Sequence, residues 1–137
     1  MENIYLTSKY NLIYVYSVPL ETHRGLLKIG QTHFSSDKSI EELEKNYKLL
    51  STFAKKRISD QTNTAGIEFK LEHVELAIKK VKKNSQEYYL QSFSDKDIHN
   101  VLYKSGYRKT KINGTKATEW FQIDLASVKD AITAYKQ

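Results

Sequence analysis

The sequence predicts an α+β domain in which a small central antiparallel sheet of about three strands is flanked by helices. Two segments rich in β-branched and aromatic residues lie close together near the N-terminus, which is typical of a hairpin. Capped amphipathic segments with helical spacing follow, interrupted by one more alternating segment. The length of 137 residues suits one domain, and no repeat or linker is present, so we expect residues 1–137 to form a single domain.

The first two predicted strands form the hairpin. Asn11–Val18 is followed by Pro19, the only proline, and Gly25–Gly30 follows after a short polar turn. Such a short connection favours antiparallel pairing of the two segments. Gly30 has two interpretations: it lets the chain leave the strand with unusual dihedral angles, or it lets another group approach the backbone closely.

The middle of the chain predicts a helix and a strand. A capping box that begins at Ser39, with apolar residues at helical spacing after it, predicts a helix over about Ser39–Phe53. Asp60–Gly66 has the composition of a loop. Phe69–Ile78 alternates between apolar and polar residues, with a change of phase near His73 that indicates a strand with a bulge.

The C-terminal third predicts two more helices. Ser94 caps the first of them with Asp97 at its third position, and Gly106 stands where a C-terminal cap belongs. Tyr107–Ala117 is basic and has the composition of a loop. Asp124 can cap a last helix, which completes the predicted order β-β-α-β-α-α.

Composition restricts the classes of protein that the chain can belong to. Its 22 Lys and Arg against 16 Asp and Glu give a net charge of +6, which favours an anionic partner. The absence of cysteine excludes disulfide bonds and thiolate metal sites and fits a reducing compartment. No apolar run spans a membrane, and the N-terminus lacks the pattern of a signal peptide. We therefore expect a cytoplasmic protein with no membrane partner.

Polar residues in or beside apolar segments are the candidates for chemistry. The chain has no Walker loop, Rossmann glycine pattern, zinc spacing or nucleophile elbow. The ordinary interpretation of Lys28 and Arg57 is a charge in solvent, on an edge strand and at a helix end. His99 suits a hydrogen-bonded core position. Glu119, which precedes Trp120–Phe121, must stay hydrated or find a cation.

A family resemblance connects these residues. Ile13–Tyr16 (IYVY), followed by Gly25–Thr32 (GLLKIGQT), resembles the paired-strand signature of the GIY-YIG nucleases, in the phage-type branch whose second motif reads KIGxT. The similarity continues through an arginine on the next helix, a strand, a His-x-x-Leu helix and a final EWF. Those motifs correspond here to Arg57, Phe69–Ile78, His99–Leu102 and Glu119–Phe121, and the resemblance covers residues 12 to about 132.

The resemblance implies that the domain cleaves DNA phosphodiester bonds with one divalent cation. Glu119 would hold that ion, Mg²⁺ or Mn²⁺, whose other ligands are waters and a phosphate oxygen. Tyr14 would lie at the attacking water and take its proton directly or through a relay. Arg57 would contact the scissile phosphate, because its planar donors fit two phosphate oxygens.

The sequence also departs from the family pattern. Lys28 replaces the tyrosine of the second motif, and a cation there is expected to lower the pKa of the Tyr14 hydroxyl. Leu12 stands where the family has the glycine that opens the first motif. A second histidine, four residues after the family's arginine, is Gln61 here, so His33 or His99 would have to fill any histidine role.

Contacts with DNA are expected from basic segments, which position the nucleic-acid backbone without reading sequence. The residues concerned are Lys55, Lys56, Lys79, Lys80, Lys82, Lys83, Arg108, Lys109 and Lys111. In the family the nuclease module is usually joined to, or associated with, a DNA-binding or helicase module. The resemblance therefore allows the chain to be the N-terminal piece of a larger protein. The sequence does not predict an oligomeric state.

Two other functions stay open at this point. The domain can be a catalytically inactive nucleic-acid-binding module with the same fold, or a protein-interaction domain whose positive charge is incidental. Only the nuclease hypothesis requires a particular arrangement of side chains in space. Tyr14, Lys28, Arg57 and Glu119 must converge on one concave surface.

Overall fold

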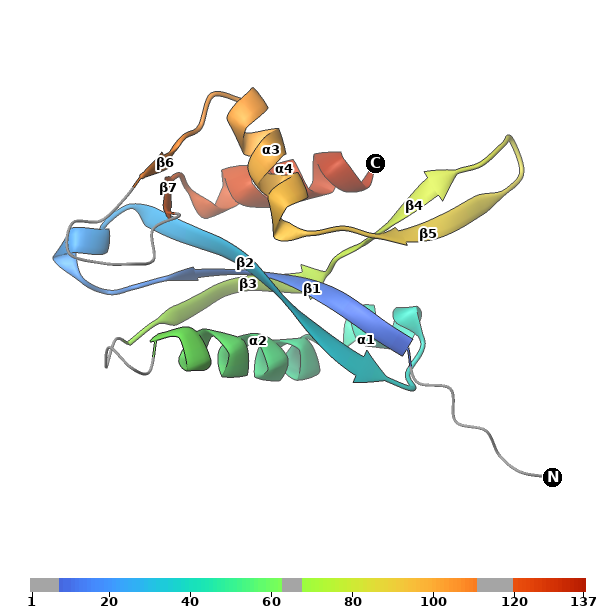
Figure 1. Ribbon diagram of the computed structural model, residues 1–137, viewed down its shortest axis with the longest axis horizontal. Helices are drawn as coiled ribbons and strands as arrows, with labels where there is room; N and C mark the ends of the chain where they lie inside the picture. The colour runs from blue at the N-terminus through green and yellow to red at the C-terminus, as the bar shows by residue number, and fades with distance from the viewer. Residues whose placement is uncertain (1–7, 63–67, 111–119) are drawn as a thin grey trace.

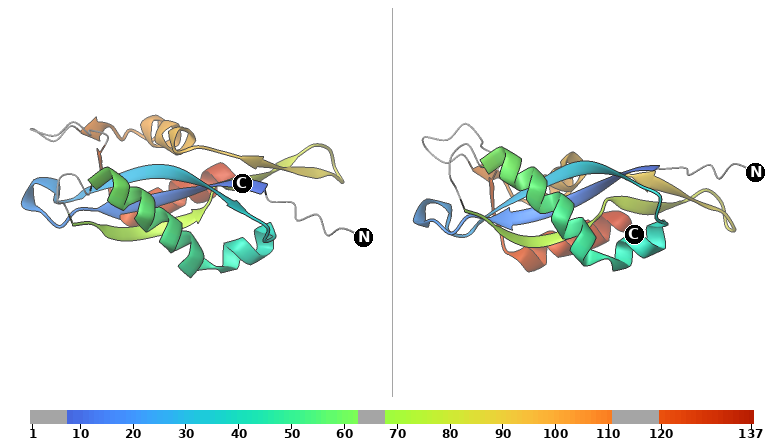
Figure 2. Two further views of the ribbon diagram at one scale, coloured as in Figure 1. Left: turned by 60° about the horizontal axis from the view of Figure 1, so that its bottom comes forward. Right: turned by 90° about the horizontal axis from the view of Figure 1, so that it is seen from below.

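A computed structural model of the chain describes residues 8–62, 68–110 and 120–137. A five-stranded sheet lies between two layers of helices, which confirms the α+β class (Figure 1). One face carries α1 (Ile40–Lys45) and α2 (Tyr47–Thr62), and the other carries α3 (Asp95–Lys104) and α4 (Leu125–Lys136). Figure 2 shows the same layering from two other directions, with α2 crossing the sheet obliquely.

The five-stranded sheet has the order β3-β1-β2-β7-β6, and all of its pairs are antiparallel. Three strands are long and two are short: β1 (Ser8–Ser17), β2 (Leu26–Ser36), β3 (Lys70–Leu76), β6 (Lys109–Thr110) and β7 (Trp120–Gln122). The three long strands are those that the sequence predicts. The two short strands are additional and extend the sheet beyond β2.

The second strand is longer than the sequence predicts. Gly30 does not end it, because β1 continues to pair with β2 as far as Ser36. On the other side of β2, β7 pairs only with Leu26–Lys28. Beyond Lys28, no strand within the described ranges pairs with this edge of β2. The edge therefore borders the space between α2 and the start of α3.

Alternation along β1 divides the core into two halves. Leu12, Tyr14 and Tyr16 face α2 and pack with its apolar side, whereas Ile13 and Val15 face α3 and α4. All five side chains are buried. The two halves account for the three layers, because each face of a central strand must be covered by apolar side chains. The helix residues that cover these faces are Leu50, Ala54 and Ile58 of α2, Ile98 and Leu102 of α3, and Val128 and Ile132 of α4.

The helix predicted over Ser39–Phe53 is two helices. The chain breaks at Asn46, whose side-chain oxygen accepts a hydrogen bond from the Leu49 amide at 3.1 Å and caps the second helix. That helix runs on to Thr62, so the first residues of the expected loop are helical. The consequence is a longer α2, which carries its last two turns over β2.

Other local predictions are confirmed. The register of β1 with β3 passes from Val15–His73 to Tyr16–Leu71, which is the expected bulge. Ser94 and Asp97 form the capping box of α3, and Gly106 has a φ of +98° after its end. The basic segment after Ile78 differs, because it forms a hairpin of β4 (Ile78–Lys82) and β5 (Tyr88–Ser92). None of the helices in the described segments has the length and apolar character needed to cross a membrane.

Burial of Tyr16 predicts a loss of stability in alkali. Tyr16 is 2% exposed, and burial, followed by the nearby Tyr14, raises its pKa well above the ordinary value. The unfolded chain releases this proton above about pH 10 while the folded chain keeps it. The free energy of unfolding is therefore unaffected below pH 10 and falls above it by up to about 1.4 kcal/mol per pH unit. Urea unfolding at pH 7 and pH 11 should show a smaller loss in Tyr16→Phe than in the wild type.

Tyr47→Phe is the matched control for this measurement, because Tyr47 is 52% exposed and its hydroxyl is not taken into the core on folding. This variant should lose as much stability between the two pH values as the wild type does. Equal losses in Tyr16→Phe and the wild type would contradict the role given to Tyr16.

Candidate active site

The register of β1 and β2 brings the first two sequence motifs together. Tyr14 lies opposite Gly30, and Tyr16 lies opposite Lys28, so all four residues belong to the sheet face that α2 covers. A Cβ atom at Gly30 would lie 2.6 Å from the Tyr14 ring and its hydroxyl. Gly30 has no positive φ, since only Gly25 and Gly106 do among the glycines in the described ranges. Of the two interpretations of Gly30, close approach is therefore the correct one, and the approaching group is Tyr14.

A concavity of about 590 Å³ opens over the unpaired edge of β2. In Figure 1, β2 passes between α2 on one side and the start of α3 on the other. The concavity brings together residues that are far apart in the sequence: Tyr14 of β1, Lys28–His33 of β2, Arg57 and Gln61 of α2, and Asp95 and Lys96 of α3. Of the predicted catalytic residues, Tyr14, Lys28, His33 and Arg57 are thus on one surface.

Tyr14 is held by a hydrogen bond from its hydroxyl to Gln61 Oε1, at 3.3 Å. Its side chain is 1% exposed, and this burial is the main cause that raises its pKa. The Arg57 guanidinium lowers the pKa through its charge and a hydrogen bond, and the negative charge of Asp95 raises it further. The pKa of Tyr14 is raised overall, whereas the sequence predicted that Lys28 would lower it. The cation that partly offsets the effect of burial on this pKa is Arg57. Tyr14 therefore stays protonated at neutral pH.

Gln61 occupies the position where the family pattern has a histidine. It lies four residues after Arg57, which places both side chains on the same side of α2 one turn apart. The longer α2 found in the structure is what brings Gln61 to the Tyr14 hydroxyl. An amide oxygen accepts a proton in a hydrogen bond but does not take it, so Gln61 fixes the orientation of the hydroxyl.

His33 has a defined tautomer. The Asn11 side chain donates from Nδ2 to the Phe93 carbonyl at 3.2 Å, so its Oδ1 is the atom that faces His33. An amide oxygen only accepts, and the His33 Nδ1 must therefore carry the hydrogen in this contact. The Nε2 atom of His33 is left as the acceptor nitrogen. His33 is exposed and lines the concavity, so this nitrogen belongs to a group that substrate can reach.

Sequence reasoning missed Asp95 and Gln31. The Asp95 amide donates to Gln31 Oε1 at 3.1 Å, which fixes the start of α3 against β2. These two residues are 64 positions apart. The capping box at Ser94 gave a signal that Asp95 begins a helix, but nothing in the local sequence indicated that this helix starts at the Tyr14 concavity.

His99 is not among the residues of the concavity. It is 3% exposed, its Nε2 donates to the Ile29 carbonyl at 2.9 Å, and its ring lies 5.3 Å from that of Phe121. Those neighbours belong to the half of the core under α3 and α4. The structure thus gives His99 the hydrogen-bonded core position that is its ordinary interpretation, where it fastens α3 to β2.

Glu119, the expected metal ligand, lies outside the described residues. Its neighbour in the chain, Trp120, pairs with Lys28 at the end of the concavity. Among the residues that the structure describes, no three His, Asp or Glu side chains come together in a way that could hold a metal ion. Mg²⁺ does not require such a group, since one or two carboxylates, waters and substrate phosphate are its usual ligands.

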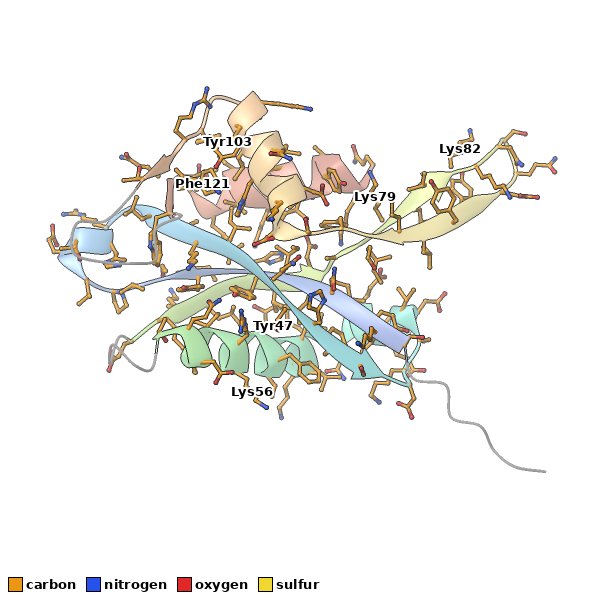
Figure 3. The ribbon with its side chains drawn as sticks, viewed as in Figure 1. Tyr47, Lys56, Lys79, Lys82, Tyr103 and Phe121 are labelled. Carbon is orange, nitrogen blue, oxygen red and sulfur yellow. The ribbon has the colours of Figure 1, made fainter. Side chains whose placement is uncertain are left out.

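The basic residues expected to contact DNA come from three segments of the chain. Lys55 and Lys56 are exposed on α2, and Lys56 borders a second hollow together with Arg57 and His33. Figure 3 shows Lys56 on the α2 side and Lys79 and Lys82 along β4. The third segment follows the end of α3. Arg108 donates to the carbonyls of Tyr103 and Tyr107, and the Lys109 ammonium lies 5.6 Å from the centre of the Tyr103 ring. Lys111 lies outside the described residues.

The comparisons with known proteins identify the family. The model of the T5orf172 domain matches residues 11–136, so the chain belongs to the T5orf172 domain family. The T5orf172 domain is a phage-associated domain related to nuclease-like folds of the GIY-YIG and HNH type. The comparison with curated proteins and the comparison with solved structures gave no match.

The contact between Gly30 and Tyr14 can be tested by a double-mutant cycle. In Gly30→Ala the new methyl group displaces the Tyr14 ring, and we expect urea unfolding to show a loss of about 1–3 kcal/mol. In a Tyr14→Leu background the conflicting ring atoms are gone, so the same substitution should cost much less. An equal cost in both backgrounds would mean that Gly30 serves another purpose.

Proposed function

We propose that the chain is a metal-dependent DNA endonuclease domain of the GIY-YIG type. The observation that supports this proposal is the meeting of Tyr14, Lys28, His33 and Arg57 in one concavity, although they come from three separate elements. A domain that only packs a core or docks a protein has no need to bring two cations, an imidazole and a tyrosine hydroxyl to one hollow. Membership of a family related to nuclease-like folds agrees with the proposal.

Arg57 and Lys28 bind the phosphate of the substrate. Both line the concavity, and Arg57 is exposed while Lys28 is half-buried. A guanidinium donates two parallel hydrogen bonds to phosphate oxygens, and its charge stabilises the extra negative charge that develops as the nucleophile attacks. Lys28 adds a second positive charge opposite Tyr16, at the end of the concavity where β7 begins to pair with β2.

Tyr14 and His33 act on the attacking water. The Tyr14 hydroxyl donates to Gln61, and its oxygen has two lone pairs, so beside the Arg57 guanidinium it can also accept a hydrogen bond from water and orient it. The raised pKa of Tyr14 excludes a phenolate at neutral pH, so the water gives its proton directly to the acceptor Nε2 of His33, which becomes an imidazolium. The water oxygen bonds to phosphorus, the bond from phosphorus to the leaving oxygen breaks, and solvent protonates that oxygen.

A divalent cation, Mg²⁺ or Mn²⁺, is part of the proposal. Glu119 would hold it. Asp95, whose carboxylate lines the concavity, would be a second ligand. When bound, the cation supplies Lewis-acid polarisation of the phosphate oxygens.

Cleavage of supercoiled plasmid tests the proposal through Arg57. Protein with Mg²⁺ or Mn²⁺ should produce nicked and linear DNA, and Arg57→Gln should reduce the rate by at least about 100-fold. Arg24→Gln is the matched control, because Arg24 is an exposed arginine paired with Glu21 at 3.5 Å and does not line the concavity. Gel electrophoresis of the products over time gives the rates.

The rival functions predict other outcomes of the same experiment. A catalytically inactive binding module would shift the plasmid in the gel without nicking it, and a protein-interaction domain would do neither. Cleavage that survives unchanged in Arg57→Gln would point to a contaminating nuclease or another site and would contradict the proposal.

A second prediction concerns the Tyr14 hydroxyl. Tyr14→Phe removes the group that orients the water and leaves the ring in the core, so we expect kcat to fall about 10- to 100-fold with KM nearly unchanged. Tyr10→Phe is the control, because Tyr10 is on the same strand and its hydroxyl donates to the Lys38 carbonyl at 3.2 Å, outside the concavity. A loss of the same size in both variants would assign it to folding rather than to the reaction.

A further inference from the structure

The hairpin of β4 and β5 forms a separate two-stranded sheet that projects from the body of the domain (Figures 1 and 2). Every residue of β5 is exposed. Tyr88, Tyr89 and Leu90 are 62%, 48% and 50% exposed, so the hairpin presents large apolar side chains to solvent. A two-stranded sheet of this kind gains little from burial, and consecutive exposed apolar residues are typical of a binding surface.

The pairing register gives the hairpin two different faces. Lys80 lies opposite Leu90 and Lys82 lies opposite Tyr88, so these four side chains share one face, here named the Tyr88 face. Tyr89 lies opposite Val81 on the other face, which also carries Lys79 and Gln91 and is named the Tyr89 face. The chain thus provides two adjacent tyrosines that point in opposite directions.

The lysines of the hairpin are not in equivalent surroundings. The Lys79 ammonium lies 4.1 Å from the ring centre of Tyr135 in α4, and the Lys83 ammonium is 3.8 Å from a Glu87 carboxylate oxygen. Lys82 is exposed and forms no ion pair with any carboxylate in the described ranges. Lys80 borders a hollow that Glu41 and Glu44 of α1 also line, so its surroundings are partly acidic. The outer half of the Tyr88 face, with Lys82 and Tyr88, is therefore the part best suited to an anionic partner.

The root of the hairpin is fastened to the candidate active site. The Ala77 amide donates to the Asn11 carbonyl at 2.9 Å, and the Phe93 amide donates to the Ala77 carbonyl at 3.0 Å. The Asn11 side chain donates to the Phe93 carbonyl and also holds His33. Since Asp95 follows β5 by only three residues, a partner held by the hairpin is held at a fixed position relative to the concavity.

We propose that this hairpin is a β-ribbon arm that enters the major groove of duplex DNA beside the cleavage point. The proposal rests on DNA being the substrate of the concavity. A two-stranded ribbon fits a major groove of about 12 Å in width. Five residues of strand span roughly 17 Å, the length of about five base-pair steps. Lys82 contacts a phosphate, and the Tyr88 ring packs against sugars and thymine methyl groups at the base edges.

Binding of a fluorescein-labelled 24-base-pair duplex, measured by anisotropy in EDTA so that nothing is cleaved, tests the arm. Tyr88→Ala should weaken the Kd about tenfold, as expected for the loss of an exposed aromatic contact at an interface. Lys82→Ala should reduce the slope of log K against log salt concentration by about 0.9, which corresponds to one phosphate contact. Tyr89→Ala is the matched control on the same hairpin, because its side chain lies on the opposite face, and it should behave as the wild type.

Groove occupancy gives an independent result. Dimethyl sulfate methylates guanine N7, which lies in the major groove, so the wild type should protect guanines within about five base pairs on one side of the cleavage point. Tyr88→Ala should lose this protection while Tyr89→Ala keeps it. Unchanged affinity, salt slope and protection in both Tyr88→Ala and Lys82→Ala would overturn the proposal and leave the Tyr88 face to a protein partner.

The arm and the endonuclease proposal fail in different ways. A wild type that binds duplex through Tyr88 and Lys82 but never cleaves plasmid would contradict the endonuclease and support the arm. A wild type that cleaves plasmid with no difference between the Tyr88 and Tyr89 variants in binding would contradict the arm alone. Absence of duplex binding by the wild type would overturn the arm outright.

Discussion

The Tyr14 ring lies across Gly30 on the neighbouring strand, and this contact determines where the other groups of the candidate site can be. The ring belongs to the core under α2, where it lies 6.0 Å from the Tyr16 ring, while its hydroxyl reaches the concavity. Any side chain at position 30 would collide with the ring and displace it, which would disturb the hydrogen bond from its hydroxyl to Gln61. The antiparallel register that sets Tyr14 opposite Gly30 also sets Lys28 opposite Tyr16 and Trp120. One strand pairing thus serves both the packing of the core and the chemistry of the site.

The electrostatics of the site follow from this double role. A tyrosine taken into the core loses its hydration, and burial therefore outweighs the nearby Arg57 in setting its pKa. The hydroxyl is consequently a fixed hydrogen-bonding group and not a ready base, while the exposed His33 is held by Asn11 with one nitrogen left to accept. In the proposed reaction, orientation of the water falls to a buried residue, Tyr14, and acceptance of its proton falls to one that solvent reaches, His33.

Local sequence signals predicted the fold well where each element carries its own marker. The cap at Ser94, the glycine at 106 and the cap at Asp124 are all where the sequence put them. The hairpin of β4 and β5 was missed because no residue of β5, and none of β4 beyond Ile78, is buried, so it shows no alternation of apolar and polar residues. The break at Asn46 was missed because the apolar spacing continues through it.

The candidate site was less predictable, because its parts meet only through tertiary structure. Tyr14, Lys28 and Arg57 were identified through short motifs that occur in the right order, not through any local signal of function. Asp95 and Gln31 meet across 64 residues, a distance that no local pattern spans. The upward shift of the Tyr14 pKa also depends on how deeply its side chain is buried. The alternation of residues along a strand does not reveal that depth, because it shows only which residues share a face.

The root of the β4–β5 hairpin has a consequence for how the chain can vary. Hydrogen bonds among Asn11, Ala77 and Phe93 close the hairpin at its base, before the strands leave the body of the domain. Residues inserted or removed at the tip, between Lys82 and Tyr88, change the length of the ribbon without moving the start of α3. The hairpin can therefore become longer or shorter at its tip, while the hydrogen bonds at its base keep Asp95 beside Tyr14.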